Sequence, residues 1–325
     1  MKRFSTPILL ILFNRPQFLP KQFNVLSGIK PLDLYISIDG PRQNNIIDII
    51  FCSEVNNKIK ELITWDCKCH FQISNSNLGC KNGPISAINW FFNQVEEGII
   101  LEDDCLPDIS FFHFSAEMLI RYRNNDKITA ICGCNYGFSS NRTSYIYSSF
   151  MNPWGWATWR RSVHEVSYNL DNWTYNNHKF LHKKIGHGYF DRDKDWFDFW
   201  VTIFNSIYNN DFKTAWDYYW IYHIFSKNKF VIIPSKNLVT NLGFGEYATH
   251  TTLISHPANN LLTQTLYAPY KGPKRLKNDI IYEKKYVKKI CYMHNDLPLS
   301  FHLKNYLVSF YPFNYLYKIV TCLRK

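Results

Sequence analysis

The sequence predicts an α/β fold with a mostly parallel sheet flanked by helices. Short apolar runs alternate with segments of helical length over the first hundred residues, and turn-forming residues close the runs. Continuous apolar runs of about four to eight residues are typical of strands buried on both faces, as in a parallel sheet. The runs that predict the first four strands are residues 8–13, 34–38, 68–73 and 99–101.

The segments between and after these strands carry helical signals. In residues 84–95, for example, Ile85, Ile88 and Val95 recur at the spacing of one helix face. The same pattern predicts further helices at residues 46–63, 109–123, 196–208 and 216–226, and further strands at 128–132 and 230–233. We expect loop and a short strand over residues 133–155, and a long loop or helical insertion over residues 169–188.

Charge divides the chain into two parts. The net charge is +11, and residues 271–325 supply +9 of it through twelve basic and three acidic residues. The remainder is close to neutral, and its aromatic side chains favour a folded body over a disordered chain. We therefore expect one domain over residues 1–265 and a basic, aromatic C-terminal extension over residues 266–325.

The extension contains a lysine-rich segment. Lys284, Lys285, Lys288 and Lys289 alternate with tyrosine and valine, a spacing that predicts an amphipathic helix with a cationic face. An anionic membrane surface is one expected partner, and a solvated helix packed on the body is the alternative. Nucleic acid is the least favoured partner, because no nucleic-acid-binding motif accompanies the charge.

The nine cysteines, an odd number, do not suggest a disulfide framework. Cys67 and Cys69 together with Cys132 and Cys134 form a zinc-ligand pattern, but single-residue spacing beside strands favours buried, reduced thiols. The expected location is therefore a reducing cytoplasm, with peripheral attachment to the inner membrane face through the extension.

Three consecutive acids, Glu102, Asp103 and Asp104, directly follow the fourth predicted strand. Burying them together is costly, because like charges repel and each carboxylate loses its water. A divalent cation carrying a diphosphate would relieve the repulsion, since carboxylate oxygens suit such cations. The pattern favours a metal site, and a solvated acidic turn is the alternative.

Charged residues also follow the neighbouring strands. Arg15 comes after the first strand, Asp39 after the second and Lys81 after the third. Carboxyl ends of parallel strands meet at one edge of a sheet, where ligands of such folds bind. Arg15 and Lys81 would face a diphosphate there. Alone, each is typical of a surface charge; together with the acids they predict a nucleotide-diphosphate site.

Seven segments, taken in order, resemble the landmarks of GT-A glycosyltransferases, which join a Rossmann-like nucleotide-sugar-binding half to a DxD-type metal motif. The chain looks most like bacterial haemolytic-protein-like sugar transferases and is more distantly similar to N-acetylglucosaminyltransferase I. The resemblance covers roughly residues 7–255. The segments are PILLILFNRP, LYISIDGPR, NLGCKNG, GIILEDDCLPDISFF, PWGWATWRR, AWDYYW and the closing stretch from Pro234 to Thr249-His250.

The resemblance implies roles for individual residues. Arg15 would meet the pyrophosphate, and Asp39 would hold the nucleotide base, expected to be uracil. Glu102 and Asp103 would hold the ribose and the sugar. Asp104 would bind Mn²⁺ or Mg²⁺, with His250 as a further metal ligand. The other implied nucleotide-sugar-binding residues are Phe13, Asn77, Gly79, Lys81 and Thr249, and Gly155 and Trp156 would wall the donor and acceptor.

An inverting transferase also needs a carboxylate that takes the proton of the acceptor hydroxyl. Asp217, which is surrounded by aromatic residues in the sequence, is the candidate base. Capping of a helix N-terminus is the alternative role for Asp217. Asp195 and Asp198 are weaker candidates, because their segment is typical of a solvated helix start.

These features lead us to expect a metal-dependent, inverting glycosyltransferase of bacterial polysaccharide biosynthesis. It would move a hexosyl or N-acetylhexosaminyl group from a nucleotide-diphosphate donor, expected to be a UDP-sugar, to a glycan or lipid-linked acceptor. One alternative is a metal-dependent phosphoryl-transfer enzyme, which would need a second cluster of carboxylates. The other alternative is a non-catalytic binding protein with the same fold.

Overall fold

The computed structural model describes residues 3–138, 143–170, 173, 194–209, 215–244, 259 and 261–291. The chain forms two compact units. The larger unit combines residues 1–168 and 213–286, and the smaller unit combines residues 169–212 and 287–325. The smaller unit contains the helix α7 (Lys194–Tyr208) and a π-helical turn, η3 (Val287–Cys291).

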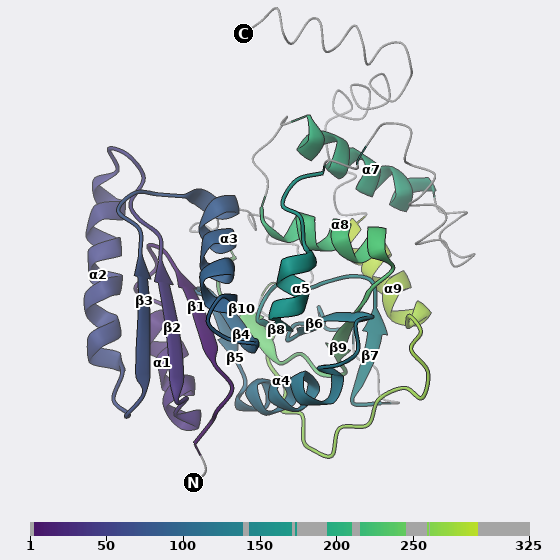
Figure 1. Cartoon of the computed structure of the whole chain (residues 1–325), viewed down its shortest axis with the longest axis horizontal. Helices are drawn as coiled ribbons and strands as arrows, with labels where there is room; N and C mark the ends of the chain where they lie inside the picture. Colours follow the sequence, from purple (N-terminus) through teal and green to yellow (C-terminus); the bar gives the residue numbers. More distant parts are fainter. Residues whose placement is uncertain are drawn as a thin grey trace, which may run out of the picture. The chain divides into compact units, whose positions relative to one another are not determined.

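An eight-stranded sheet lies at the centre of the larger unit (Figure 1). Its order is β3-β2-β1-β4-β8-β6-β9-β7, and β8 and β7 run opposite to the other strands. The predicted α/β fold with a mostly parallel sheet is therefore confirmed. The strands are β1 (Ile8–Leu12), β2 (Asp33–Ile38), β3 (Lys68–Ile73), β4 (Glu97–Glu102), β6 (Ile128–Cys132), β7 (Tyr145–Ser148), β8 (Trp156–Trp159) and β9 (Phe230–Pro234).

Alternation of side chains along the strands gives the sheet two apolar faces. Ile8 and Leu10 of β1 belong to the main core cluster, which includes residues of α1 and α4. Tyr35 of β2 turns to the opposite face, where its ring lies 4.9 Å from that of Phe91 in α3. Helices therefore cover both faces. They are α1 (Leu19–Ile29), α2 (Ile46–Leu62), α3 (Gly79–Phe92), α4 (Ile109–Tyr122), α5 (Arg160–Glu165), α8 (Asp217–Lys227) and α9 (Ile280–Tyr286).

A small second sheet lies beside the acidic turn. It pairs β5 (Cys105–Pro107) with β10 (Val239–Asn241) in antiparallel fashion. In the part of the chain that the structure describes, none of the helices has the length and apolar character needed to cross a membrane.

Three elements differ from the sequence-based expectation: β8, α5 and α3. β8 and α5 were not predicted, because all four residues of β8 are buried and therefore show no polar alternation. β8 inserts antiparallel between β4 and β6. Helix α3 begins at Gly79, earlier than the expected Pro84, and Pro84 lies inside it. Proline favours the first turn of a helix, which made it a misleading start signal here.

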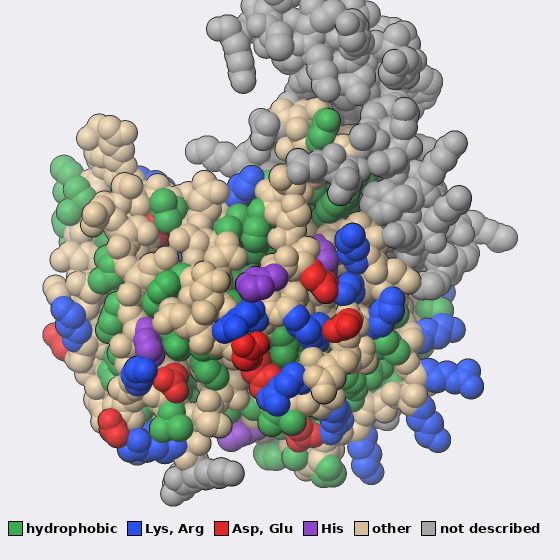
Figure 2. All heavy atoms as spheres, viewed as in Figure 1, with side chains coloured by type: hydrophobic (Ala, Val, Ile, Leu, Met, Phe, Trp, Pro, Cys, Tyr) green, Lys and Arg blue, Asp and Glu red, His purple; other side chains and the backbone are tan. Residues whose placement is uncertain are grey.

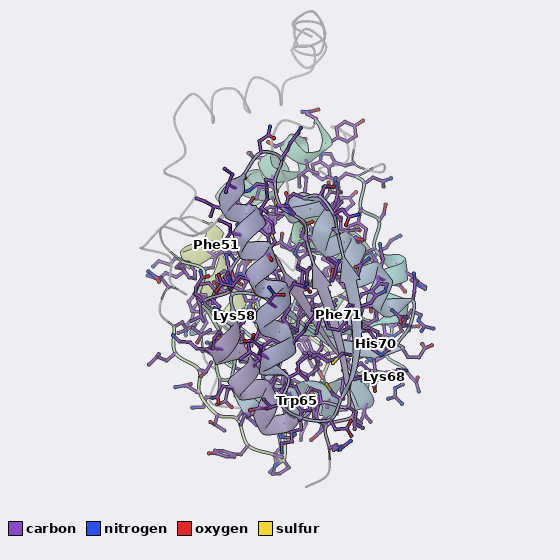
Figure 3. The ribbon with its side chains drawn as sticks, turned by 90° about the vertical axis from the view of Figure 1, so that its left-hand side faces the viewer. Phe51, Lys58, Trp65, Lys68, His70 and Phe71 are labelled. Carbon is purple, nitrogen blue, oxygen red and sulfur yellow. The ribbon has the colours of Figure 1, made fainter. Side chains whose placement is uncertain are left out.

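The outer edge of the sheet exposes apolar side chains. β3 is the outermost strand, and Figure 3 looks onto this edge, with Phe51 on α2 and Phe71 on β3. Val55 and Ile59 bring the inner side of α2 into the core. The exposed large apolar residues at this edge are Ile46, Ile47, Ile49, Ile50, Phe71 and Ile73.

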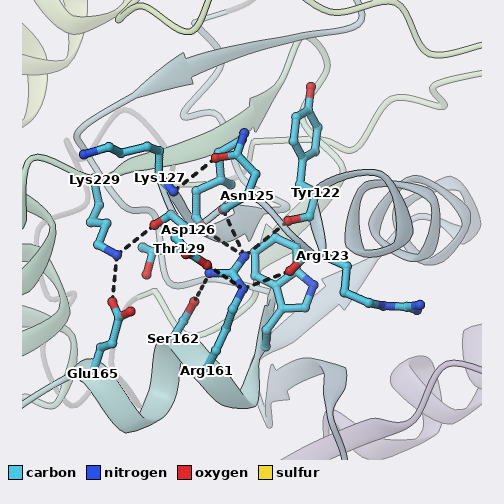
Figure 4. A network of polar contacts seen from close by, with 12 residues as sticks. Tyr122, Arg123, Asn125, Asp126, Lys127, Thr129, Arg161, Ser162, Glu165 and Lys229 are labelled. Atoms are coloured by element: carbon cyan, nitrogen blue, oxygen red, sulfur yellow. Dashed lines mark hydrogen bonds and ion pairs between the residues drawn. The ribbon is translucent and has the colours of Figure 1, made fainter.

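Arg161 forms hydrogen bonds with the C-terminal end of helix α4 and the loop after it (Figure 4). Its guanidinium donates hydrogen bonds of 3.1–3.2 Å to the backbone oxygens of Tyr122, Arg123, Asn125 and Ile128. The last carbonyl groups of a helix have no partner inside that helix. Arg161 therefore supplies donors to backbone oxygens at and beyond the end of α4.

Arg161→Ala should lower the free energy of unfolding by about 2–3 kcal/mol, because it leaves backbone oxygens without a donor. Urea unfolding followed by tryptophan fluorescence measures this loss. The matched control is Arg123→Ala, which removes only the half-exposed ion pair with Glu97 and should cost less than about 1 kcal/mol. Equal losses in the two variants would contradict the role given to Arg161.

Helix α9 is docked on the body through a buried carboxyl group. Glu283 is 2% exposed, and its Oε1 accepts hydrogen bonds from Ser148 Oγ at 2.9 Å and Ser149 N at 2.8 Å. Burial raises the pKa of Glu283 to about 7, although the two serine donors oppose the shift. Ionising this group is therefore harder in the folded chain than in the unfolded chain.

The stability of the protein should carry a pH dependence from Glu283. The folded pKa of about 7 lies above the ordinary 4.5, so stability should fall as pH rises from 4.5 to 7. Across this range the free energy of unfolding should fall by about 3 kcal/mol. Urea midpoints measured across this range should fall less steeply in Glu283→Gln than in the unmodified protein. Identical slopes for the two proteins would contradict the raised pKa.

Candidate functional site

Strand register brings the predicted site residues to one edge of the sheet. In β1, Leu12 pairs with Ile38 of β2, and Ile11 pairs with Glu102 of β4. The residues that follow, Phe13, Asp39 and Asp103, therefore leave the sheet side by side. This is the edge expected from parallel strands.

Arg15 joins the loop after β1 to the acids after β4. Its Nη1 lies 2.7 Å from Asp103 Oδ1 and 2.9 Å from Asp104 Oδ2, and all three side chains are largely buried. The backbone N–H of Phe13 also donates to Asp103, at 3.3 Å. Burial alone would lower the pKa of Arg15, but the charges of Asp103 and Asp104 outweigh it and raise the pKa. One guanidinium thus offsets part of the charge of two carboxylates.

The remaining negative charge shows in the pKa values of the acids. Burial, with repulsion from Asp104 and Asp103, raises the pKa of Glu102 to about 8. Burial and the charge of Asp103 raise the pKa of Asp104 to about 6, against the opposing effect of Arg15. Glu102, with its pKa of about 8, keeps its proton at neutral pH, and the single positive charge of Arg15 is shared by the two aspartates. The aspartate pair is therefore short of positive charge, as expected of a place that receives a cation.

Gln22 of α1 supports the acidic turn from behind. Its Nε2 donates to the backbone oxygens of Glu102 and Cys105, both at 3.0 Å. Gln22 is 1% exposed. The sequence-based reasoning did not identify Gln22, because a single glutamine in a helix carries no signal of a partner eighty residues away.

Asp39 is occupied by protein donors. Its two oxygens accept hydrogen bonds of 2.9–3.1 Å from the backbone N–H groups of Gly40, Leu78 and Gly79 and from Asn77 Nδ2. Burial raises the pKa of Asp39, and the N–H donors partly offset this. A carboxylate has about four acceptor positions, so Asp39 fixes the loop before α3. The predicted direct contact between Asp39 and a base would have to compete with these four bonds.

A cavity of about 790 Å³ lies between this loop, the loop after β1 and the start of α2. Its volume falls within the range of about 300–1,000 Å³ that is usual for small-molecule sites. The acidic turn forms one part of the wall. Of the residues predicted from sequence, the cavity is lined by Phe13, Arg15, Asp39, Asn77, Gly79, Glu102 and Asp103.

Arg42 and Asp48 line the same cavity and were not predicted. Asp48 is fully buried and accepts two hydrogen bonds from the Arg42 guanidinium, at 2.6 and 2.9 Å, and one from Asn14 Nδ2 at 2.7 Å. The hydrogen bonds from Arg42 lower the pKa of Asp48. The Arg42 guanidinium lies 5.7 Å from the centre of the Phe13 ring. A signal was present in the sequence, since Asp48 is the only acid in a run of isoleucines.

The first turn of α8 lies against two parts of the site. Trp216 Nε1 donates to Glu102 Oε1 at 3.0 Å, and Lys81 Nζ lies 4.7 Å from the centre of the Tyr219 ring. Between these contacts, Asp217 is the first residue of α8. Its Oδ1 is buried, with no hydrogen-bond partner among the described residues. Burial raises the pKa of Asp217 to about 6.

The predicted wall residues lie deeper than expected. Trp156 is 0% exposed, and its ring packs between those of Trp216 and Trp220. It is therefore a core residue, and the expectation that it walls a sugar site is corrected. Gly155 has a φ of +63°, and a side chain there would collide with Val239. Gly155 and Trp156 shape the start of β8.

Thr249 and His250 lie outside the described residues, so the metal site is assessed on the acids alone. Asp103 Oδ1 and Asp104 Oδ2 both approach one nitrogen of Arg15, so both point at one cationic position. A divalent cation would share these aspartates with Arg15, either through their other oxygens or in place of Arg15 Nη1, and would take its remaining ligands from phosphate and water. Within the described ranges, no group of three His, Cys, Asp or Glu side chains converges as a complete metal site.

Among the described residues, the two cysteine pairs with zinc-like spacing do not form a metal site. Cys132 and Cys134 are buried, and the described cysteines are free thiols. Cys67 and Cys69 lie together at β3, with their sulfur atoms 3.3 Å apart. Four strands separate β3 from β6, which Cys132 ends, so the two pairs do not meet.

Asp39→Asn should loosen the loop before α3. An amide has one acceptor oxygen and places N–H groups against the donors of Leu78 and Gly79, so stability should fall by about 1–3 kcal/mol. Hydrogen exchange at these two amides, together with urea unfolding, measures the effect. Asp33→Asn, at a partly exposed aspartate, is the control. Unchanged exchange in Asp39→Asn would show that Asp39 does not hold the loop.

A scan of the sequence against protein-family models finds no match, and neither does a search of curated proteins. Solved structures give loose likenesses. One is 4-diphosphocytidyl-2C-methyl-D-erythritol synthase from Anaerococcus prevotii DSM 20548, at 13% identity and a TM-score of 0.30 over 49% of this chain and 71% of that one. Mannose-1-phosphate geranyltransferase from Thermus thermophilus is 7% identical, with a TM-score of 0.32 over 71% of this chain and 73% of that one. A candidate nucleotide-diphospho-sugar transferase from Desulfovibrio desulfuricans G20 is 12% identical, with a TM-score of 0.29 over 50% of this chain and 65% of that one. The family named from the motifs therefore stays a prediction, and the proposed function rests on the residues of the site.

Proposed function

We propose that the protein is a metal-dependent, inverting glycosyltransferase. It would transfer a hexosyl or N-acetylhexosaminyl group from a UDP-sugar to a hydroxyl group of a glycan or lipid-linked acceptor. A lipid-linked acceptor would keep the reaction at a membrane surface. The observation that carries the proposal is the cavity of about 790 Å³ that ends at Arg15, Glu102 and Asp103.

The lining of the cavity combines two kinds of chemistry. Phe13, Arg42 and Leu78 contribute ring, guanidinium and apolar groups that would suit a flat base. Arg15 and the acids would suit a diphosphate with its cation. A nucleotide diphosphate matches both, with an apolar base and a strongly charged tail.

The transfer step makes one bond and breaks one. The acceptor oxygen bonds to the anomeric carbon as its proton passes to a carboxylate, and the electron pair of the broken bond leaves with the diphosphate. Arg15, which lines the cavity, would stabilise the charge on that leaving group, and Lys81, whose Nζ lies over the Tyr219 ring, would assist it. A divalent cation held by Asp103 and Asp104 would neutralise further charge on the diphosphate.

Asp217 is the proposed base. It follows Trp216, which is bonded to Glu102, so it lies next to the acidic turn. Its Oδ1 has no partner among the described residues, and its pKa is raised to about 6. A raised pKa makes a carboxylate a stronger base while leaving it ionised at neutral pH. Activity should therefore rise with pH through about 6.

Nucleotide binding is the first test. At saturation, UDP with Mn²⁺ should raise the melting temperature by roughly 3–6 °C, and GDP should raise it less. Asp104→Asn should remove the part that depends on Mn²⁺, with Asp103→Asn as a second variant and circular dichroism as a check of folding. Absence of any shift with UDP, UDP-sugars and Mn²⁺ would overturn the proposal.

The same assay separates binding from chemistry at Asp217. Asp217→Asn should keep the UDP shift and lose roughly 10²–10⁴-fold in sugar transfer or UDP-sugar hydrolysis. Asp195→Asn and Asp198→Asn, at the two weaker candidates, should keep both the UDP thermal shift and the activity. Wild-type turnover in Asp217→Asn would show that Asp217 is not the base. It would leave the proposed nucleotide site unaffected.

A further inference from the structure

The stretch from residue 271 to residue 286 turns a basic face outward. Figure 2 shows Lys and Arg side chains gathered at the right-hand edge of the larger unit, where Figure 1 places α9 and the segment before it. The exposed basic residues of this stretch are Lys271, Lys274, Arg275, Lys277, Lys284 and Lys285.

The two acids of this stretch are engaged with the fold. Glu283 is buried against Ser148 and Ser149. Asp279 is partly buried, and its Oδ1 accepts a hydrogen bond of 2.9 Å from the backbone N–H of Tyr282 in the first turn of α9. The outward face therefore carries more net positive charge than the sequence of the stretch suggests.

The orientation of this face is fixed by packing. Tyr282 and Tyr286 are 3% and 4% exposed, and the Tyr286 ring stacks on Phe150 with centroids 4.4 Å apart. With that side of α9 buried, Ile281 faces out at 60% exposure, beside Lys284 and Lys285 at the helical spacings of three and four residues. The exposed face thus joins an apolar side chain to lysines.

We propose that this face docks on a lipid bilayer that contains anionic phospholipids. A helix with exposed lysines beside apolar residues suits the boundary between headgroups and acyl chains. Each cation near such a surface contributes about 1 kcal/mol, so six of them suffice for reversible binding without a spanning helix. Single-stranded nucleic acid is a poorer fit, because the tyrosines of α9 point inward and leave no ring for stacking on bases.

A row of rings connects the docking face to the acidic turn. Tyr286 contacts Tyr136 at 5.8 Å, Tyr136 contacts Trp154 at 5.2 Å, and Trp154 contacts Phe244 at 5.5 Å. Two residues before Phe244, the backbone N–H of Leu242 donates to the backbone oxygen of Asp104 at 2.7 Å. Docking would therefore hold the site at a fixed place near the membrane. The docking itself does not depend on the proposed function, whereas delivery of a lipid-linked acceptor does.

Co-sedimentation of the full chain with vesicles tests this proposal. The protein should bind phosphatidylcholine vesicles that contain phosphatidylglycerol, bind pure phosphatidylcholine much less, and dissociate as salt rises. Lys284→Glu with Lys285→Glu should weaken binding by roughly tenfold or more. Lys21→Glu with Lys30→Glu makes the same charge change at two exposed lysines at and just after α1 and should leave binding nearly unchanged.

Ile281→Ser separates insertion from simple charge attraction. It should weaken binding to the anionic vesicles and leave binding to a single-stranded oligonucleotide unchanged. Equal losses in the two lysine pairs, or binding that ignores salt and lipid charge, would overturn the proposal. Tighter binding to the oligonucleotide than to vesicles, with no effect of Ile281→Ser, would assign the face to nucleic acid instead. The UDP thermal shift should persist in every variant, which keeps failure of docking distinct from failure of the proposed function.

Discussion

The ion pairs of Arg15 with Asp103 and Asp104 are the interaction on which the site depends. Burying three adjacent acids is unfavourable unless a cation lies among them. Arg15 supplies that cation and joins the loop after β1 to the turn after β4. The same link sets one wall of the cavity, because Arg15 and Asp103 both line it. One arginine shared by two aspartates cannot neutralise both, so the site keeps an affinity for further positive charge.

A second constraint positions the chemistry. Trp216 bonds to Glu102 at the end of β4 and Tyr219 lies against Lys81 in the first turn of α3, so the first turn of α8 contacts two elements at once. Asp217 lies between these two contacts in the sequence, so its backbone is fixed beside the acidic turn. Its position on a helix that is packed on the sheet suits a base, because a rigid element places a carboxylate more reproducibly than a loop does.

The sequence was sufficient for the parallel half of the sheet and for the acidic turn. Apolar runs mark β1, β2 and β4, and parallel register then requires their polar ends to meet. It was not sufficient for β8 or for Trp156, because a strand buried on both faces looks like any apolar segment. The sequence also could not show that the Asp39 oxygens accept hydrogen bonds from Leu78 and Gly79, since those bonds join residues about forty positions apart.

Charge is distributed by the fold rather than by the sequence alone. The number of basic residues after residue 270 predicted a cationic segment. The net positive charge of its exposed face is increased because Glu283 is turned inward and Asp279 is bonded to the first turn of α9. The opposite arrangement holds at the sheet edge, where acids are gathered inward around one arginine. Negative charge is thus concentrated in a cavity wall that would receive a cation, and positive charge is left on a surface that would meet an extended anionic partner. Each arrangement is costly to the folded chain alone, because like charges repel, and a ligand of opposite sign removes that cost.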